Sequence, residues 1–181
     1  MELLGTHKVS FDGIRSLAIQ CHSLALSAYH LLLGSTHKDK EGRSKRIYEE
    51  LFTAKLLALA IVIRTTFYQG SSSDTTSSYI IHSGFLYRYN GDDEKSDIFT
   101  IKDVCDKIIH AEEVSMFLED GVPNPTTTLL GAYQKHKWEL TFSVSLFCEG
   151  VLNWLQDLQK AEEEANTGLK RKSTNPETPT E

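Results

Sequence analysis

The fold is decided by residues 56–63, LLALAIVI, the most apolar stretch of the chain. Eight residues are too few to span a bilayer, which takes about 20 apolar residues in a helix, and the run ends at Arg64. We predict that it belongs to a core helix over residues 42–68, whose first half is amphipathic and whose second half is apolar nearly all round. Such a helix is typical of the centre of a helical bundle.

Two more long helices follow from the spacing of apolar residues. They recur at three- and four-residue intervals over residues 10–33, which predicts a helix that Gly34 ends. From Leu140 to Leu158 they are spaced four, three, four, three and four apart, the a/d pattern of a long final helix that ends near Glu164.

The remaining segments are shorter and partly extended. Residues 79–97 carry aromatic and aliphatic residues around the turn signal Asn90-Gly91, which predicts a small hairpin inserted between helices. Residues 128–142 fit either a hairpin or a strand followed by the start of a helix, and the pattern leaves both open. Thr100 is the predicted N-cap of another helix, because Asp103 three residues later can complete a capping box.

The whole chain of 181 residues suits one domain with one substantial core. We predict a mostly α fold, a bundle of about four long helices with a small extended or hairpin excursion. The helical domain covers residues 1–165. Residues 166–181 are poor in apolar side chains and contain two prolines, which predicts a disordered tail.

Charge and cysteine content limit the partners and the compartment. The formal net charge of -6 argues against a broadly electropositive nucleic-acid surface but leaves room for a local site. The three cysteines lie far apart without a C-x-x-C pair, which predicts buried free thiols in a reducing compartment. Since the first residues lack a basic region followed by a long apolar run, we expect no signal peptide, no membrane segment and a cytoplasmic location.

A polar string lies on the helix predicted within residues 99–114. It holds four residues at positions i, i+3, i+4 and i+7, on one strip away from the apolar face: Asp103, Asp106, Lys107 and His110. A carboxylate one turn before a histidine can accept a hydrogen bond from one ring nitrogen and raise the basicity of the other. Asp106 and His110 are thus the minimum set of groups for proton transfer: a histidine and a carboxylate that can orient it. The alternative is a surface histidine beside an unrelated aspartate.

This segment carries a family resemblance. The run CDKIIHA follows IKDV, and after it come a loop, a Gly-aromatic stretch and a long terminal helix. The pattern resembles HEPN domains (higher eukaryotes and prokaryotes nucleotide-binding), which are bundles of about four helices. Many members are metal-independent ribonucleases of antiviral-defence and toxin–antitoxin systems. Their motif is an arginine, four to six residues, and a histidine, with a polar residue after the arginine. His110 matches the histidine and Asp106 the polar follower, but Cys105 or Asp103 stands where the arginine is expected.

The resemblance implies a composite site between two protomers whose motif helices face each other across a cleft. His110 would act as general base or acid on a ribose 2′-hydroxyl, and Asp106 would orient it. Without a metal, a cation must stabilise the phosphorane-like charge. Three residues could supply this cation: Arg64, Lys102 and Lys107. Because an unpaired guanidinium at the end of an apolar helix is costly, we expect Arg64 to face a partner, a cleft or a carboxylate of the same chain.

Two functions therefore stay open. The first is a HEPN-like endoribonuclease, or the degenerate subunit of one, with RNA as its ligand. The second is a non-enzymatic helical interaction or scaffold protein, which the missing arginine and the acidic balance favour. In both cases we expect a homo-oligomer or a protein partner. We expect no cofactor and no metal, since the chain has no H-E-x-x-H, E-x-x-H or Walker A motif.

Overall fold

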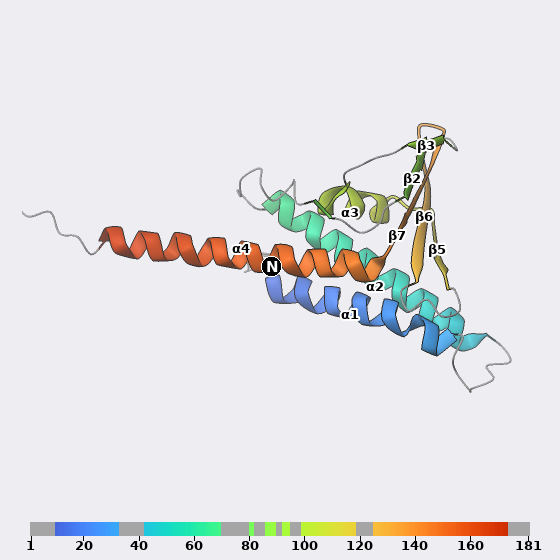
Figure 1. Ribbon diagram of the computed structural model, residues 1–181, viewed down its shortest axis with the longest axis horizontal. Coiled ribbons are helices and arrows are strands. Elements are labelled where there is room, and N and C mark those ends of the chain that lie inside the picture. The colour runs from blue at the N-terminus through green and yellow to red at the C-terminus, as the bar shows by residue number, and fades with distance from the viewer. Residues whose placement is uncertain are drawn as a thin grey trace, which may run out of the picture.

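The computed structural model describes residues 10–32, 42–69, 80–81, 86–89, 92–94, 99–118 and 125–173. Within these ranges four helices pack together beside an antiparallel sheet (Figure 1). The fold is mostly helical, as predicted. The connecting loops, the predicted turn at Asn90-Gly91 and the last eight residues of the predicted tail lie outside the described residues.

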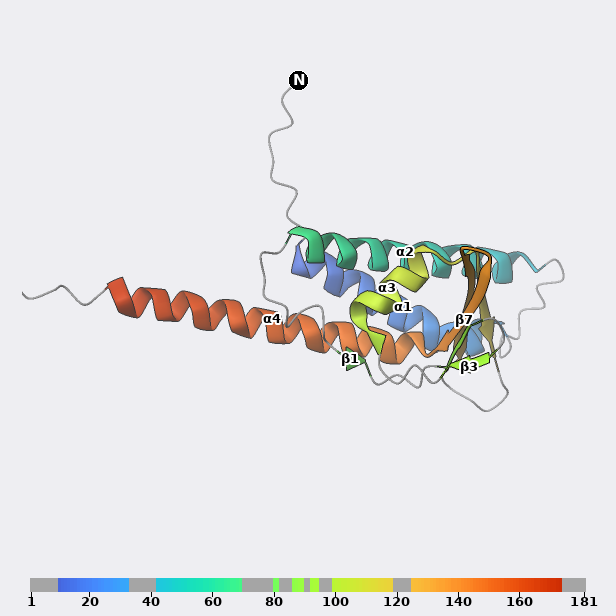
Figure 2. The same cartoon turned by 90° about the horizontal axis from the view of Figure 1, so that it is seen from above.

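Three of the helices are long and one is short. Their bounds are α1, Phe11–Leu32; α2, Arg43–Gln69; α3, Ile101–Ile109; and α4, Val144–Ser173. α1 packs against both α2 and α4 and lies between them (Figure 2). The first two helices match their predicted ranges closely. The expectation of four long helices is wrong for α3, which has nine residues.

The helical core forms where the three long helices meet. α1 presents a buried stripe with several small residues, which lets its neighbours approach closely: Ile14, Ala18, Cys21, Ala25 and Ala28. α2 contributes a row of larger side chains: Tyr48, Phe52, Leu56, Leu59, Ala60 and Ile63. The three cysteines are free and buried, as predicted. The apolar run of α2 is buried on one side only, because Leu57 and Ile61 are exposed.

α4 has the predicted seam, with two corrections. Val144, Phe147, Val151 and Trp154 are buried, and the Trp154 ring stacks on Phe67 of α2 with 5.4 Å between centroids. Leu140 does not belong to this helix; it lies buried in a strand, and α4 begins only after Ser143. α4 also continues past Glu164 to Ser173, so the segment predicted as a disordered tail is helical over its first residues. Leu, Lys and Arg are good helix formers, and in this segment they extend a helix whose first half is already anchored in the core.

The sheet is larger than the predicted excursion. Its five strands are arranged in the order β3-β2-β7-β6-β5. Their bounds are β2, Leu86–Tyr89; β3, Asp92–Glu94; β5, Glu113–Phe117; β6, Thr126–Tyr133; and β7, His136–Phe142. A separate two-stranded ladder joins β1 (Ile80–Ile81) to β4 (Phe99–Thr100). The sequence left residues 128–142 open between two interpretations, and the structure has the hairpin: β6 and β7 pair from Tyr133↔His136 onward.

The single helix predicted within residues 99–114 is in fact a helix followed by a strand. α3 ends at Ile109, His110 is its C-cap, and β5 begins at Glu113. In β5 exposed residues alternate with half-buried ones, the period of a strand rather than of a helix. The backbone N–H of Glu112 already donates to the carbonyl oxygen of Leu130 in β6, at 2.8 Å. Pairing with a distant strand therefore ends the helix.

Candidate functional site

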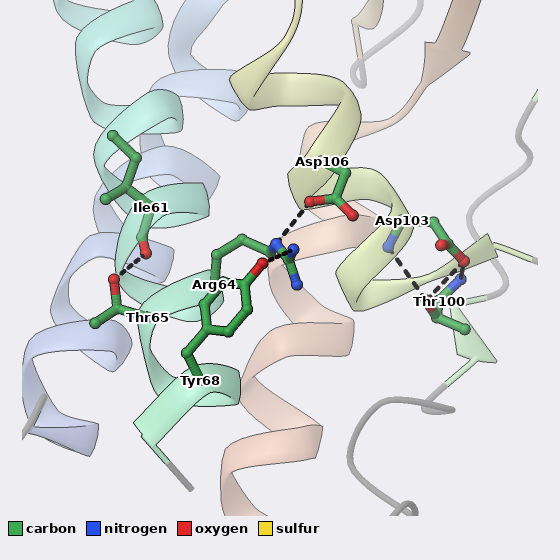
Figure 3. A network of polar contacts seen from close by, with 7 residues as sticks. All are labelled: Ile61, Arg64, Thr65, Tyr68, Thr100, Asp103 and Asp106. Carbon is green, nitrogen blue, oxygen red and sulfur yellow. Dashed lines mark hydrogen bonds and ion pairs between the residues drawn. The ribbon is translucent and has the colours of Figure 1, made fainter.

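The polar string of α3 begins with a helix cap. The Thr100 hydroxyl oxygen accepts from the backbone N–H of Asp103 at 3.2 Å, and an Asp103 carboxylate oxygen accepts from the backbone N–H of Thr100 at 3.0 Å. This reciprocal pair is the predicted capping box (Figure 3). Thr100 and Asp103 thus each satisfy one backbone N–H of the other at the start of the helix, where the N–H groups lack partners within the helix.

Asp106 pairs with the arginine that the sequence singled out. Arg64 Nε lies 2.6 Å from Asp106 Oδ1, and its Nη2 donates to the Tyr68 hydroxyl at 2.8 Å (Figure 3). The guanidinium also lies over the Tyr68 ring, 4.8 Å from its centroid. The Arg64 side chain is only 13% exposed and that of Asp106 36%. Of the three surroundings expected for Arg64, the structure has the carboxylate of the same chain, and the ion pair joins α2 to α3.

Lys107 extends over the sheet. Its Nζ lies 4.4 Å from the centroid of the Trp138 ring, within the range of a cation–π contact. Trp138 is buried in β7 and pairs with Gly131 of β6. A Cβ on Gly131 would overlap the Trp138 ring and would also approach the His110 carbonyl oxygen at 3.0 Å. Gly131 therefore makes room for the indole that Lys107 covers.

Two candidate residues of α3 remain: Cys105, at a position where the motif has an arginine, and Lys102. Cys105 is fully buried, and burial raises the pKa of its thiol, with the nearby Asp106 carboxylate adding to the increase and Arg64 opposing it. The thiol stays protonated and inward-facing, so it supplies no cation. Lys102 is half-buried and makes no ion pair with the residues that the structure describes.

His110 is exposed at the C-terminal end of α3. Its backbone N–H donates to the Asp106 carbonyl oxygen at 3.1 Å. Among the described contacts its ring has no hydrogen bond, and the Asp106 carboxylate is directed to Arg64 instead. The structure thus brings Arg64 and Asp106 together, while Lys102, Lys107 and His110 each lie in separate surroundings along one helix.

A second candidate site, which the sequence did not indicate, is a groove between α2 and β5. It has a volume of about 580 Å³ and is lined by one strand, its following residue, part of α2 and the end of α1: Val114, Ser115, Met116, Phe117, Leu118, Lys45, Tyr48, Glu49, Phe52, Thr53 and Leu32. β5 is an edge strand, paired only with β6 among the described strands. The sequence did not indicate this groove, because the residues of β5 were predicted to continue the helix that precedes them.

The groove has an apolar wall and a charged rim. The Tyr48 and Phe52 rings stack with 6.0 Å between centroids, and the Tyr48 hydroxyl donates to the Leu24 carbonyl oxygen at 2.6 Å. Burial raises the pKa of Tyr48, so this phenol stays neutral. At the rim Lys45 and Glu49 form an ion pair of 3.7 Å between exposed side chains. Such a groove suits a ligand that has an apolar side chain beside a polar backbone.

No family model, no curated protein and no solved structure matches this chain. Within the described ranges no cluster of three or more His, Cys, Asp or Glu residues is placed to hold a metal ion.

Proposed function

We propose that the chain is a non-enzymatic interaction module that binds an extended segment of a partner protein in the groove between α2 and β5. The observation that supports this most directly is a groove of about 580 Å³ along β5, which pairs on one side only among the described strands. An edge strand offers backbone N–H and C=O groups to an added strand, and a neighbouring groove receives the alternate side chains of that strand.

The partner segment is defined by the chemistry of the groove. Its backbone pairs with β5, and an aliphatic or aromatic side chain enters between Phe52 and Met116. Phe117, which is 63% exposed at the end of β5, lies on the opposite face of the strand from Met116 and adds apolar surface for a partner residue of the opposite orientation. The Lys45–Glu49 pair at the rim favours polar residues at the alternating outward positions.

Selection from a displayed library of random peptides tests this proposal. Thr53 is exposed and lines the groove, so Thr53→Arg fills it without touching the core. Ser23→Arg adds the same side chain to the exposed face of α1 and serves as the control. We expect selected peptides to be rich in β-branched and aromatic residues, to bind wild type and Ser23→Arg equally, and to lose at least about tenfold in affinity for Thr53→Arg. Amide NMR shifts should centre on residues 113–117. Peptides that bind all three proteins alike would refute the groove as the site.

A second candidate function is the metal-independent endoribonuclease that the HEPN resemblance implies. The observation that favours it is an exposed His110 within one helical turn of the Arg64–Asp106 pair. Against it, Arg64 is largely buried and already hydrogen-bonded to two partners, and Asp106 does not orient His110. The geometry therefore supports this function less well than binding.

His110→Ala separates the two functions. A general acid or base typically contributes about 10² to 10⁴ in rate, so a ribonuclease should lose that much cleavage, with or without a chelator. The melting temperature should not change, because the exposed ring packs against nothing described. His30→Ala, another exposed histidine on α1, is the control. Wild-type protein that cleaves no RNA, with His110→Ala unimpaired in peptide binding, leaves only the interaction module.

A further inference from the structure

The outer face of α2 carries an apolar stripe that no described element covers. Seven positions, spaced four, three, four, three, four and three apart, form this outer stripe: Ile47, Leu51, Ala54, Ala58, Ile61, Thr65 and Tyr68. It lies about 180° around the helix from the row that faces the core, at 100° per residue. Ile47 is 60% exposed, Ile61 47% and Tyr68 78%.

From this stripe we infer that α2 is a self-association surface, which pairs with α2 of a second copy of the chain as a parallel two-stranded coiled coil. The inference does not rest on the proposed peptide groove, although the two surfaces adjoin along α2: Glu49 and Thr53 line the groove and also the shallow hollow beside Ala54. A strict heptad stripe is the pattern that keeps one helix seam facing another over several turns. The stripe covers three heptads, about 32 Å of helix. Its larger side chains, Ile47, Leu51, Ile61 and Tyr68, are exposed, and Ala58 and Thr65 are half-buried.

The small residues in the middle of the stripe shape it for a second helix. Ala54 and Ala58 lie between the larger side chains at the two ends of the stripe. A shallow hollow of about 450 Å³ lies beside Ala54, and Glu49, Glu50, Thr53 and Leu57 also line it. A knob from a facing helix fits such a hollow, and alanines let two helix backbones approach closely. α2 forms one outer edge of the helical group, with α1 on its inner side, so a partner can reach it (Figure 2).

Charges beside the stripe favour a second copy of the chain as the partner and a parallel orientation of the two helices. With Leu51 and Ala58 at a positions, Glu50 occupies a g position and Lys55 the e position five residues later. In a parallel pair g of one helix meets e of the other, so each Glu50 approaches the Lys55 of the partner copy and the attraction occurs twice. In an antiparallel pair g faces g and e faces e, so the attraction between Glu50 and Lys55 is lost. An anionic lipid surface is a poorer match, because the stripe is flanked by charges of both signs.

Sedimentation equilibrium of the full chain, with single substitutions, tests this inference. We expect a wild-type dimer at micromolar concentration. Ile61→Lys should raise the dimer dissociation constant by more than about tenfold with an unchanged circular dichroism melting curve. Ile19→Lys on α1 is the matched control, since Ile19 is 50% exposed and Ile61 47%. It should leave the dimer intact. A monomeric wild type, or equal weakening by both substitutions, overturns the inference.

Disulfide trapping tests the direction. The native cysteines are buried, so a cysteine introduced at an end of the stripe is the accessible one. Ile47→Cys should form a disulfide-linked dimer with itself if the helices run parallel. If Ile47→Cys crosslinks only when mixed with Tyr68→Cys, the helices are antiparallel and the parallel dimer is wrong. α2 is also long and apolar enough to cross a membrane by length and composition, a weak criterion that core helices meet as well. A chain that stays monomeric and floats with lipid vesicles overturns the inference in favour of a membrane.

Discussion

Arg64 shows how one side chain can set the position of a whole helix. It ends the apolar part of α2, and its guanidinium is held by Asp106 of α3 and by Tyr68 one turn further along α2. A guanidinium that is 13% exposed needs such partners, because an unpaired charge in that position loses hydration without compensation. The pair thus fixes how α3 lies on α2.

The first prediction concerns this ion pair. Arg64→Met and Asp106→Asn should each destabilise the fold by about 1 to 3 kcal/mol, since each leaves the other group without its partner. The double variant should lose less than the sum, because neither charge is then left unpaired. Urea unfolding of the four proteins measures the coupling. Glu50→Gln, which removes an exposed partner of Arg46, should change stability by well under 1 kcal/mol. Additive losses would mean that the pair does not couple α2 to α3.

The second prediction concerns alkaline pH. Burial raises the pKa of Tyr48 and of the Cys105 thiol, and a hydrogen bond with Cys21, together with burial, raises the pKa of the Cys148 thiol. In the unfolded chain these groups titrate near their ordinary values, about 8.5 for cysteine and 10 for tyrosine. Folded protein therefore holds more protons than unfolded protein above those values. The free energy of unfolding should be flat near neutral pH and fall above about pH 8.5, by up to about 1.4 kcal/mol per pH unit for each group.

Tyr48→Phe isolates one of these contributions. It should lower stability at pH 7 by about 1 kcal/mol, through the lost hydrogen bond to the Leu24 carbonyl. It should also make the fall above pH 10 shallower than in wild type. Tyr133→Phe is the control for the loss of a tyrosine hydroxyl, because Tyr133 is 64% exposed. Denaturant unfolding at several pH values gives both slopes, and identical slopes for all three proteins would contradict the assignment.

At the scale of elements, the features that could be predicted from the sequence are those formed within a short segment of the chain. The capping box of Thr100 and Asp103 is contained in four residues, so the sequence located it correctly. The helices α1 and α2 follow from short-range periodicity. By contrast, the end of α3 depends on pairing with β6, and the bond between Arg64 and Asp106 joins residues far apart in the chain. Such features arise from tertiary contacts that no local pattern encodes.

The groove could not be predicted for the same reason. Its polar and apolar residues come from α1, α2 and β5, and β5 is an edge only because of the strand order. His110 is the opposite case. The sequence placed it off the apolar face, where it lies, but its spacing from Asp106 predicted a side-chain contact that Arg64 takes instead.

The third prediction concerns the hairpin between β6 and β7. Its two loop residues, Gln134 and Lys135, have φ values of 48° and 75°. Side chains with a Cβ are disfavoured by about 1 to 2 kcal/mol in this region, and Asn-Gly is the preferred pair for such a loop. Changing Gln134→Asn together with Lys135→Gly should therefore stabilise the fold by about 1 kcal/mol, raising the melting temperature by about 2 to 4 °C.

Lys137→Gly provides the contrast. It introduces a glycine two positions along, inside β7, where an extended backbone gains nothing from glycine's freedom. The melting temperature should fall. A rise with Lys137→Gly, or no rise with the loop change, would mean that the hairpin backbone is not the source of strain.

At the scale of the whole molecule, stability depends on the inner face of α2. Ile63 is fully buried there, whereas Ile61 is 47% exposed on the outer stripe. Ile63→Asp should unfold the protein, because it buries an unpaired carboxylate at a cost of several kcal/mol against a total stability of about 5 to 15 kcal/mol. Ile61→Asp should leave the chain folded. Circular dichroism melting of both variants checks this, and a folded Ile63→Asp would place the core elsewhere.

The two tryptophans of the chain fall in different layers. Trp138 lies in the sheet with a lysine ammonium over its ring, and Trp154 lies among the helices against Phe67. A cation over an indole and an aromatic ring beside one give different emission, so the molecule carries two optical reporters of its own. Emission followed at two wavelengths during unfolding would thus separate the loss of the sheet from the loss of the bundle. A single shared transition would mean that α3, through Asp106 on one side and Lys107 on the other, makes both layers one cooperative unit.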